Sequence, residues 1–447
     1  MPLPSLLPPD HPDRAQLAAE VHARPPEPLA APSRASYVAV RVEGDARVAE
    51  LAHIATLCAH HGLPPPAGDG TQWAANLGPL RFKWERHGEF SSYTFFAAGL
   101  SEAPFSAPAA GLLPDGWLAG VPGQTVFAAH ARLAAAAAAS ADMLACVPPA
   151  DQLVAHFGAN VVVGAGIGDG AGLAFTDFMI HGDGFARFLL IDREMTDRQA
   201  GRMLQRLFEI EAYRMMALLA LPMARGLWPR VMQVERTLAD LTARIAINPA
   251  DPGRHDEALL HELMALAAEV ESALAASQSR FGASRAYHAL VTTRIGELRE
   301  RRIAGLQTID EFMARRLSPA MATCATVSQR LHDLSERVAQ ASSLLSTRVD
   351  IARKQQNQAL LVATAHRAKL QLRLQQTVEG LSLAAIVYYL AGLVSYAAKA
   401  LKAAGLPLST DLVTGAAVPL LALGTWWVLR RIHQGLARDE PPSRSHH

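Results

Sequence analysis

The chain has 447 residues, and its 42 Lys and Arg against 41 Asp and Glu give a formal net charge of +1. This near-neutral charge, with no basic stripe interleaved with aromatic residues, gives no indication of nucleic-acid binding. Half of the residues are hydrophobic, and the excess is concentrated after residue 379, which indicates a C-terminal anchor rather than a many-helix transporter. The three cysteines, Cys58, Cys146 and Cys324, are far apart and form no C-x-x-C pair, so we expect neither a zinc ribbon nor a disulfide framework.

The N-terminal segment does not have the pattern of a signal peptide. It carries Asp10, Asp13 and Glu20, whereas a signal peptide needs a basic start followed by an unbroken apolar run. We therefore expect the soluble part to stay on the side of the membrane where it is made.

Residues 1–191 predict an α+β domain. Residues 35–42 (ASYVAVRV) are typical of a strand. Residues 45–61 predict an amphipathic helix, and residues 80–86 and 90–96 alternate as two antiparallel strands. The side of the helix expected to face the core consists of Val48, Leu51, Ile54, Ala55 and Cys58. Further strands are expected at residues 124–132, 160–163, 172–180 and 185–191. The order β-α-β-β favours α+β over a doubly wound fold.

Several motifs that resemble cofactor or metal sites fail on spacing. The glycine-rich residues 164–172 (GAGIGDGAG) contain neither G-x-G-x-x-G nor a P-loop, so we interpret them as a hairpin turn. His261-Glu262 begins like a zinc-protease helix, but residue 265 is Ala. His60-His61 is expected at a helix end. We predict no metal and no cofactor.

One polar set is the candidate site: Glu20, His22, Arg24, Trp84, Arg86, His87 and Glu89. Strand alternation puts Lys83, Glu85 and His87 on one face, and Trp84 and Arg86 on the other. An arginine on the apolar face needs an anionic partner if it is buried, and Glu20 and Glu89 are the candidates. The set is either an ion-paired network that pins the N-terminal segment to the sheet or a ligand or catalytic site. No nucleophile–base pair is visible, so no catalytic residue is assigned.

Residues 192–377 predict a helical, coiled-coil stalk. Breaks are expected at Pro222 and Gly226, in a turn at residues 248–253, and at Gly305; Gly282 is a possible kink position. From residue 307 to 377 one helix of about 100 Å is expected. Its first part carries a heptad seam of Val327, Leu331, Leu334, Val338, Ala341 and Leu345. The seam packs either on the preceding helices or on copies of itself in a homo-oligomer.

Residues 378–436 predict a transmembrane hairpin with uncharged spans at 380–398 and 412–429. The first span is roughly 28 Å long, close to the bilayer core of about 30 Å. The second span ends with Trp426 and Trp427, and Arg430 and Arg431 follow, as expected at a membrane–water interface. Basic residues flank the outer ends of both spans, so the positive-inside rule puts both termini, including the short tail at 437–447, in the cytoplasm.

Five short segments carry a family resemblance: residues 20–26 (EVHARPP), 84–90 (WERHGEF), 177–180 (DFMI), 183–188 (DGFARF) and 378–382 (VEGLS). With them the chain resembles a bacterial family of predicted membrane-anchored proteins, a domain of unknown function designated DUF3422. The resemblance covers nearly the whole chain. It implies a multi-pass protein of the bacterial inner membrane but no activity.

A second likeness is architectural only. An α/β head, a long stalk helix and a two-helix C-terminal hairpin look like the magnesium transporters that have two spans per subunit. The Gly-Met-Asn signature of that family is absent, and residues 395–397 (SYA) stand in its place.

Three functions follow as hypotheses. We expect a non-enzymatic scaffold that binds an unknown protein partner beside the lipid bilayer. The alternatives are a homo-oligomeric channel or transporter, and an enzyme using the candidate set in the N-terminal domain.

Overall fold

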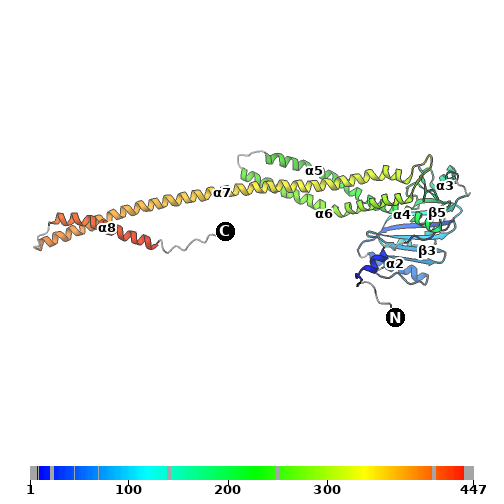
Figure 1. The fold of residues 1–447 in the computed structure, drawn as a ribbon, viewed down its shortest axis with the longest axis horizontal. Helices are drawn as coiled ribbons and strands as arrows, with labels where there is room; N and C mark the ends of the chain where they lie inside the picture. Colours follow the sequence, from blue (N-terminus) through cyan, green and yellow to red (C-terminus); the bar gives the residue numbers. More distant parts are fainter. Residues whose placement is uncertain are drawn as a thin grey trace, which may run out of the picture. The chain divides into compact units, whose positions relative to one another are not determined.

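The computed structural model describes residues 8, 10–20, 25–44, 46–68, 70–137, 142–246, 252–404 and 409–436. Within these ranges the chain is α+β, with a mixed sheet in the N-terminal half and long helices after it, which confirms the predicted class (Figure 1). It divides into two compact units, residues 1–247 with 259–343 and residues 248–258 with 344–447. The coiled coil stays a prediction.

The sheet of the first unit has nine strands in the order β2-β3-β4-β1-β5-β8-β7-β6-β9. Neighbours are antiparallel except β5 and β8, which are parallel. The strands are β1 Ser33–Arg41, β2 Gln72–Leu77, β3 Leu80–Arg86, β4 Phe90–Ala98, β5 Gln124–Ala135, β6 Val163–Ile167, β7 Gly172–Thr176, β8 Ala186–Asp192 and β9 Arg301–Arg302. Expected strands are present at β1, β3, β4, β5, β7 and β8. The strand expected at residues 160–163 was wrong, because only Val163 is in a strand, as the first residue of β6. β2 and β9 had no sequence prediction.

Both faces of the sheet are covered. Helix α2 (Ala46–His60) packs its Ile54 and Leu57 into a core with Phe82 and Trp84 of β3. On the other face, helix α4 (Asp197–Leu218) stacks Phe208 on Tyr37 of β1. Short elements complete this part: α1 Arg14–Glu20, α3 Ala150–Phe157, and the 3-10 turns Ala109–Leu112, Leu118–Gly120 and Met143–Cys146.

The predicted core side of α2 was wrong at its start. Val48 is three-quarters exposed, whereas Glu50 is completely buried and aligns with Ile54 and Cys58. The carboxylate takes the inward position because buried donors of the sheet face it, as described below.

The glycine-rich segment forms a hairpin, as predicted, but its first half is strand β6 instead of turn. A side chain at Gly164 would place its Cβ 2.5 Å from the ring of Phe175, so only glycine fits against β7. The turn itself is short, and Gly168, Asp169 and Gly170 adopt positive φ there.

Four long helices follow: α5 Ala220–Ala246, α6 Pro252–Leu298, α7 Ile309–Ala403 and α8 Thr410–Leu436. The expected break at Pro222 and Gly226 was wrong, because α4 ends before Leu219 and α5 runs through both residues. Pro222 lies in the first turn of α5, where a backbone N–H has no intrahelical acceptor. Gly282 does not interrupt α6. The predicted turn at 248–253 lies mostly outside the described residues, as does the tail at 437–447.

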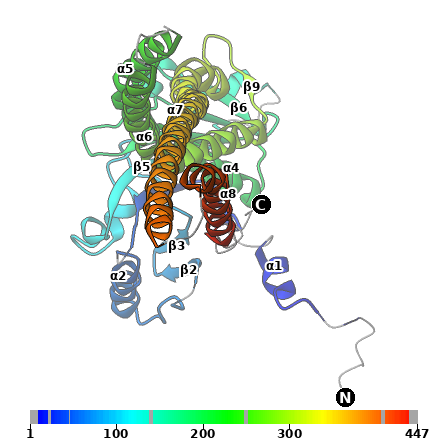
Figure 2. The same cartoon turned by 90° about the vertical axis from the view of Figure 1, so that its left-hand side faces the viewer.

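The seam of α7 packs on α5 and α6 within the first unit, where the three helices lie side by side in both views (Figures 1 and 2). Val327, Leu331, Leu334 and Val338 are buried there. Arg330 of α7 pairs with Glu235 of α5 at 3.2 Å. Of the two alternatives, packing on the preceding helices therefore accounts for this part of the seam.

The second unit holds the start of α6, the rest of α7, and α8. Arg348 contacts Asp256 at 3.2 Å and Arg353 contacts Glu257 at 2.8 Å. By length and composition, α7 and residues 410–428 of α8 can each cross a membrane. Many apolar side chains of residues 380–398 and 412–428 are exposed; Leu381, Tyr388 and Leu412 are each about three-quarters exposed.

Candidate functional site

The described members of the predicted polar set lie on the two faces of the sheet. Trp84 and Arg86 point toward α2, and His87 and Glu89 lie toward α4 and α6. His22, Arg24 and the side chain of Glu20 lie outside the part of the chain that the structure describes. The set is therefore two networks, and whether either binds a ligand stays a prediction.

Glu50 is the centre of the network under α2. Its carboxylate accepts hydrogen bonds from Trp84 Nε1 at 2.9 Å and from the Tyr93 hydroxyl at 2.7 Å. Arg86 Nη2 lies 3.5 Å from the other carboxylate oxygen, and its guanidinium covers the Trp84 ring. Burial, and then the charge of Glu50, raise the pKa of Tyr93 well above its usual value.

Arg86 therefore pairs with Glu50, which the predicted set did not contain. Glu89 pairs with Arg280 instead, and the side chain of Glu20 lies outside the described residues. A sequence signal for Glu50 existed, because Glu50, Ile54, Leu57 and Cys58 recur at helical spacing. Residue type favours the hydrophobic Val48 over a carboxylate on the core side, and it does not show that an acid faces buried donors.

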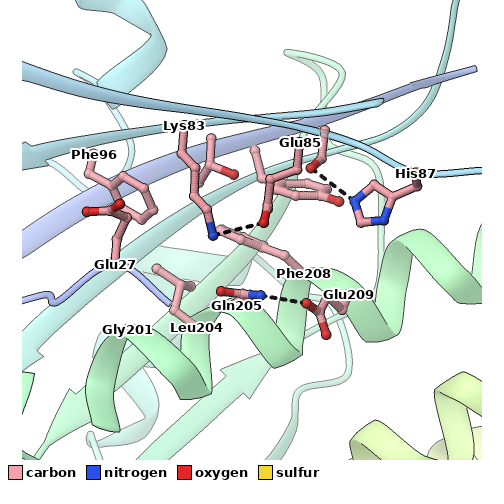
Figure 3. A pocket seen from close by; sticks show the side chains of 13 residues that line it. Glu27, Lys83, Glu85, His87, Phe96, Gly201, Leu204, Gln205, Phe208 and Glu209 are labelled. Carbon is pink, nitrogen blue, oxygen red and sulfur yellow. Dashed lines mark hydrogen bonds and ion pairs between the residues drawn. The ribbon is translucent and has the colours of Figure 1, made fainter. Parts of the chain in front are cut away.

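The other face holds the ion pair between Lys83 and Glu85, at 2.9 Å. Lys83 Nζ also donates to the carbonyl of Pro25 at 2.7 Å, which ties the N-terminal segment to the sheet. Figure 3 shows these side chains with His87 around a small cavity between the sheet and α4. Burial is the main cause that raises the pKa of Tyr37 in its wall, and the nearby Tyr213, Glu209 and Glu85 raise it further.

This cavity is too small for a substrate. It offers about 20 Å³, which is room for roughly one water molecule. Its polar groups have neighbours within the fold: Gln205 donates to Glu209 at 2.7 Å, and His87 lies 3.4 Å from the Ser92 hydroxyl. The geometry supports a structural network here.

Glu89 joins the β3–β4 turn to α6. Its carboxylate accepts hydrogen bonds from both terminal nitrogens of Arg280, at 3.0 and 3.1 Å, which form a bidentate pair. Burial first, and then Glu89, raise the pKa of neighbouring Tyr287 to about 12. Glu89 therefore positions the sheet on the helices.

A second site lies in the loop between β7 and β8, where sequence reasoning expected a strand up to residue 180. β7 ends at Thr176, and buried Asp177 organises the loop. Its carboxylate accepts from Asn160 Nδ2 and from His181 Nε2, each at 2.8 Å, and from the backbone N–H of Met179 at 3.2 Å. The expected strand was wrong here because these side-chain bonds replace the ladder.

The fixed loop forces Phe178 into an unusual conformation. Its φ of 55° is costly for an aromatic residue, and its ring stacks on Phe312 of α7 with centroids 4.4 Å apart. A cavity of about 540 Å³ opens between this loop, the end of α4 and the start of α7. Its lining includes Leu218, Leu317 and the exposed Arg316.

Exposed apolar side chains surround this cavity. Val161 is 82% exposed and Ile180 is 68% exposed, and Met179 beside them is half exposed. We name Val161, Met179 and Ile180 the loop patch. A cluster of apolar side chains at the edge of a cavity is typical of a binding surface.

The far end of the loop is held by His130 of β5. Its ring stacks on Phe185 with centroids 3.9 Å apart, and its Nδ1 lies 2.9 Å from the Ser36 hydroxyl. The Ser36 hydroxyl also accepts a hydrogen bond from the backbone N–H of Ala110. Its own proton is therefore directed to the neutral imidazole of His130. Burial lowers the pKa of His130 to about 4, although Asp183 opposes the shift.

Acidification should therefore destabilise this unit. His130 stays neutral in the folded protein but takes a proton near pH 6.5 when the protein is unfolded. Its contribution to the free energy of unfolding is therefore complete above pH 6.5 and is lost as the pH falls toward 4. The lowered pKa corresponds to about 3 kcal/mol over that window. Urea denaturation at a series of pH values measures it. His130→Leu should reduce the slope of the free energy of unfolding against pH, and His332→Ala at an exposed position should leave that slope unchanged. Equal slopes in the unsubstituted protein and both variants would contradict the role of His130.

Among the residues in the described ranges, no group of three or more His, Cys, Asp or Glu side chains is placed to hold a metal ion. Neither a curated protein nor a solved structure matches the chain. One protein family matches residues 9–436, nearly the whole length, and its description is protein of unknown function. The chain thus belongs to the DUF3422 family.

Proposed function

We propose that this is a membrane-anchored, non-enzymatic protein that binds a partner beside the bilayer. The observation that carries the proposal is the uncharged, exposed apolar surface of residues 380–398 and 412–428. Two helices of bilayer length whose leucines and tyrosines face outward would be unfavourable in water and favourable in lipid.

The ends of these helices support the same proposal. Lys399 lies over the ring of Tyr396 at 5.9 Å, and Arg431 lies over the ring of Trp427 at 4.9 Å. Cations stacked on aromatic rings are suited to a membrane interface, where the ring is in the headgroup layer and the charge reaches water. The basic flanks favour the bacterial inner membrane with both termini in the cytoplasm, as the positive-inside rule requires.

The loop patch is the proposed contact for the partner. The described members of the predicted polar set are engaged within the fold, whereas Val161, Met179 and Ile180 are apolar, exposed and adjacent to a cavity. A loop held in a strained conformation by a buried Asp177 is pre-organised, which reduces the entropy lost on binding.

One experiment in cells tests anchoring and partner binding together. A photo-crosslinking amino acid is placed at Met179, cells are irradiated, and membranes are extracted with alkaline carbonate before detergent. We expect the protein to stay in the pellet until detergent is added, and a discrete crosslinked product to form from position 179.

The matched control places the same amino acid at Val48, an exposed apolar position on α2. Anchoring is contradicted if the well-folded protein appears in the carbonate supernatant. Partner binding at the loop patch is contradicted if positions 48 and 179 give the same products.

A further inference from the structure

The middle of α7 is a helix that nothing in the described structure covers. Leu345 and Val349 are the last buried residues before it, and Arg353 makes the last ion pair with α6. From Lys354 to Val378 every residue is exposed. This segment, residues 354–378, is roughly 38 Å long at the usual helical rise, and we call it the open segment.

The open segment is both apolar and basic. Leu360, Leu361, Leu370, Leu372 and Leu374 are each at least half exposed. Between Asp350 and Glu379 the sequence has no acidic residue, whereas it has basic residues at Arg353, Lys354, Arg367, Lys369 and Arg373. A helix of this length without tertiary packing or internal ion pairs is marginal in water, so the segment needs a partner.

The spacing of the apolar residues defines the face that a partner would cover. Leu360, Ala363, Arg367, Leu370 and Leu374 step by three and four, which places them in one stripe of the helix. Val378 extends the stripe by one further turn. The stripe therefore has the spacing of a coiled-coil seam, with a positive charge at one of its inner positions.

We propose that the open segment binds an acidic amphipathic helix of another protein. In such a pair the partner supplies apolar residues along the stripe and carboxylates opposite Arg367 and Arg373. The complementary charges would fix both the choice of partner and its register.

A second copy of this chain fits the segment poorly. Two copies anchored in one membrane would be parallel and in register, so each Arg367 would face its own counterpart inside the seam. Lys369 and Arg373 would add like charges along the same length, and no acidic residue of the segment offsets them.

Anionic lipid is also a weaker fit than a protein helix. Along the helix axis Arg367 is about 20 Å from the first span and Arg373 about 10 Å. The headgroup layer extends only about 5–8 Å beyond the hydrocarbon on each side, and the surface potential decays with a Debye length of about 8 Å. Lipid headgroups therefore reach the end of the open segment and not its middle.

The test uses the full-length protein in nanodiscs of zwitterionic lipid and two labelled peptides. The first is a helix-forming heptad peptide with Leu at the a and d positions and Glu at e and g. The second is identical but has Lys in place of Glu. Fluorescence anisotropy should show binding of the Glu peptide, with an affinity that falls as salt is added, and binding of the Lys peptide at least about tenfold weaker.

Charge reversal within the open segment provides the decisive variant. Arg367→Glu, Lys369→Glu and Arg373→Glu together should reverse the preference between the two peptides. The matched control reverses three exposed arginines of other helices, Arg198, Arg202 and Arg236, and should leave the preference unchanged. Circular dichroism shows whether either variant still folds. The double substitution Leu370→Ser and Leu374→Ser is a second test that changes no charge. It should weaken the binding of the Glu peptide and leave the binding of the Lys peptide unchanged.

Three results would overturn the proposal. The first is equal binding of the two peptides. The second is loss of Glu-peptide binding when anionic lipid is included in the nanodisc, which would assign the segment to headgroups. The third is a detergent-solubilised mass of a dimer that the Leu370 and Leu374 substitutions convert to a monomer, which would assign it to a second copy. The proposal does not depend on the loop patch, so either can fail alone.

Discussion

Glu50→Ala is expected to lower the free energy of unfolding by about 3–5 kcal/mol, the cost of breaking a buried charge pair by removing one partner. The substitution removes the acceptor of Trp84 Nε1 and of the Tyr93 hydroxyl, two completely buried donors, and it removes the carboxylate beside the half-buried Arg86. Urea denaturation followed by tryptophan fluorescence measures the effect, because Trp84 reports directly on this core.

Glu50→Gln is the matched control. The amide oxygen still accepts one of the neutral donors, so we expect a smaller loss, concentrated in the interaction with Arg86. Joint replacement of Glu50 and Arg86 by leucine should recover part of the stability, since no charge is left unpaired. A loss below about 1 kcal/mol for Glu50→Ala would show that Glu50 does not anchor α2 to the sheet.

Gly201→Ala in α4 is expected to destabilise the protein by about 2 kcal/mol or more, in the range typical of overpacking. Glycine to alanine inside a helix normally stabilises it by roughly 0.5–1 kcal/mol. At this position, however, the new Cβ would lie 1.8 Å from the carbonyl oxygen of Glu27, so either α4 or the chain around Glu27 must move. The sign of the effect is therefore reversed, and a thermal melt monitored by circular dichroism detects it.

Gly282→Ala in α6 is the control for this prediction. Nothing lies within 4 Å of a Cβ at that position, so the ordinary helix preference should apply and the melting temperature should rise. If the two substitutions shift the melting temperature in the same direction, the close approach of residue 27 to α4 is wrong.

Local patterns predicted most strands and helices, because alternation and helical spacing are properties of neighbouring residues. β3 and β4 could be read from their alternation around His87-Gly88-Glu89. The two membrane-length helices could be read from their uncharged length alone.

Contacts between distant parts of the chain could not be predicted in the same way. Whether Pro222 breaks a helix depends on where that helix begins, and Pro222 lies in the first turn of α5, which starts at Ala220. Residues 177–180 read as strand, but Asn160 and His181 hold Asp177 in a loop. The candidate set failed to include Glu50 for the same reason, because its three donors come from strands that lie 34 to 43 residues away in sequence.

The two-residue strand β9 has a consequence for how the molecule can be divided. Arg301 and Arg302 pair with β6, Ile303 fills the core beside Phe157, and the carbonyl of Gln307 accepts from Gly164. A recombinant fragment that stops at residue 191 would expose the free edge of β6, which invites strand-to-strand aggregation. The sheet and the base of the long helices are therefore one folding unit, and gene fragments for expression should retain both.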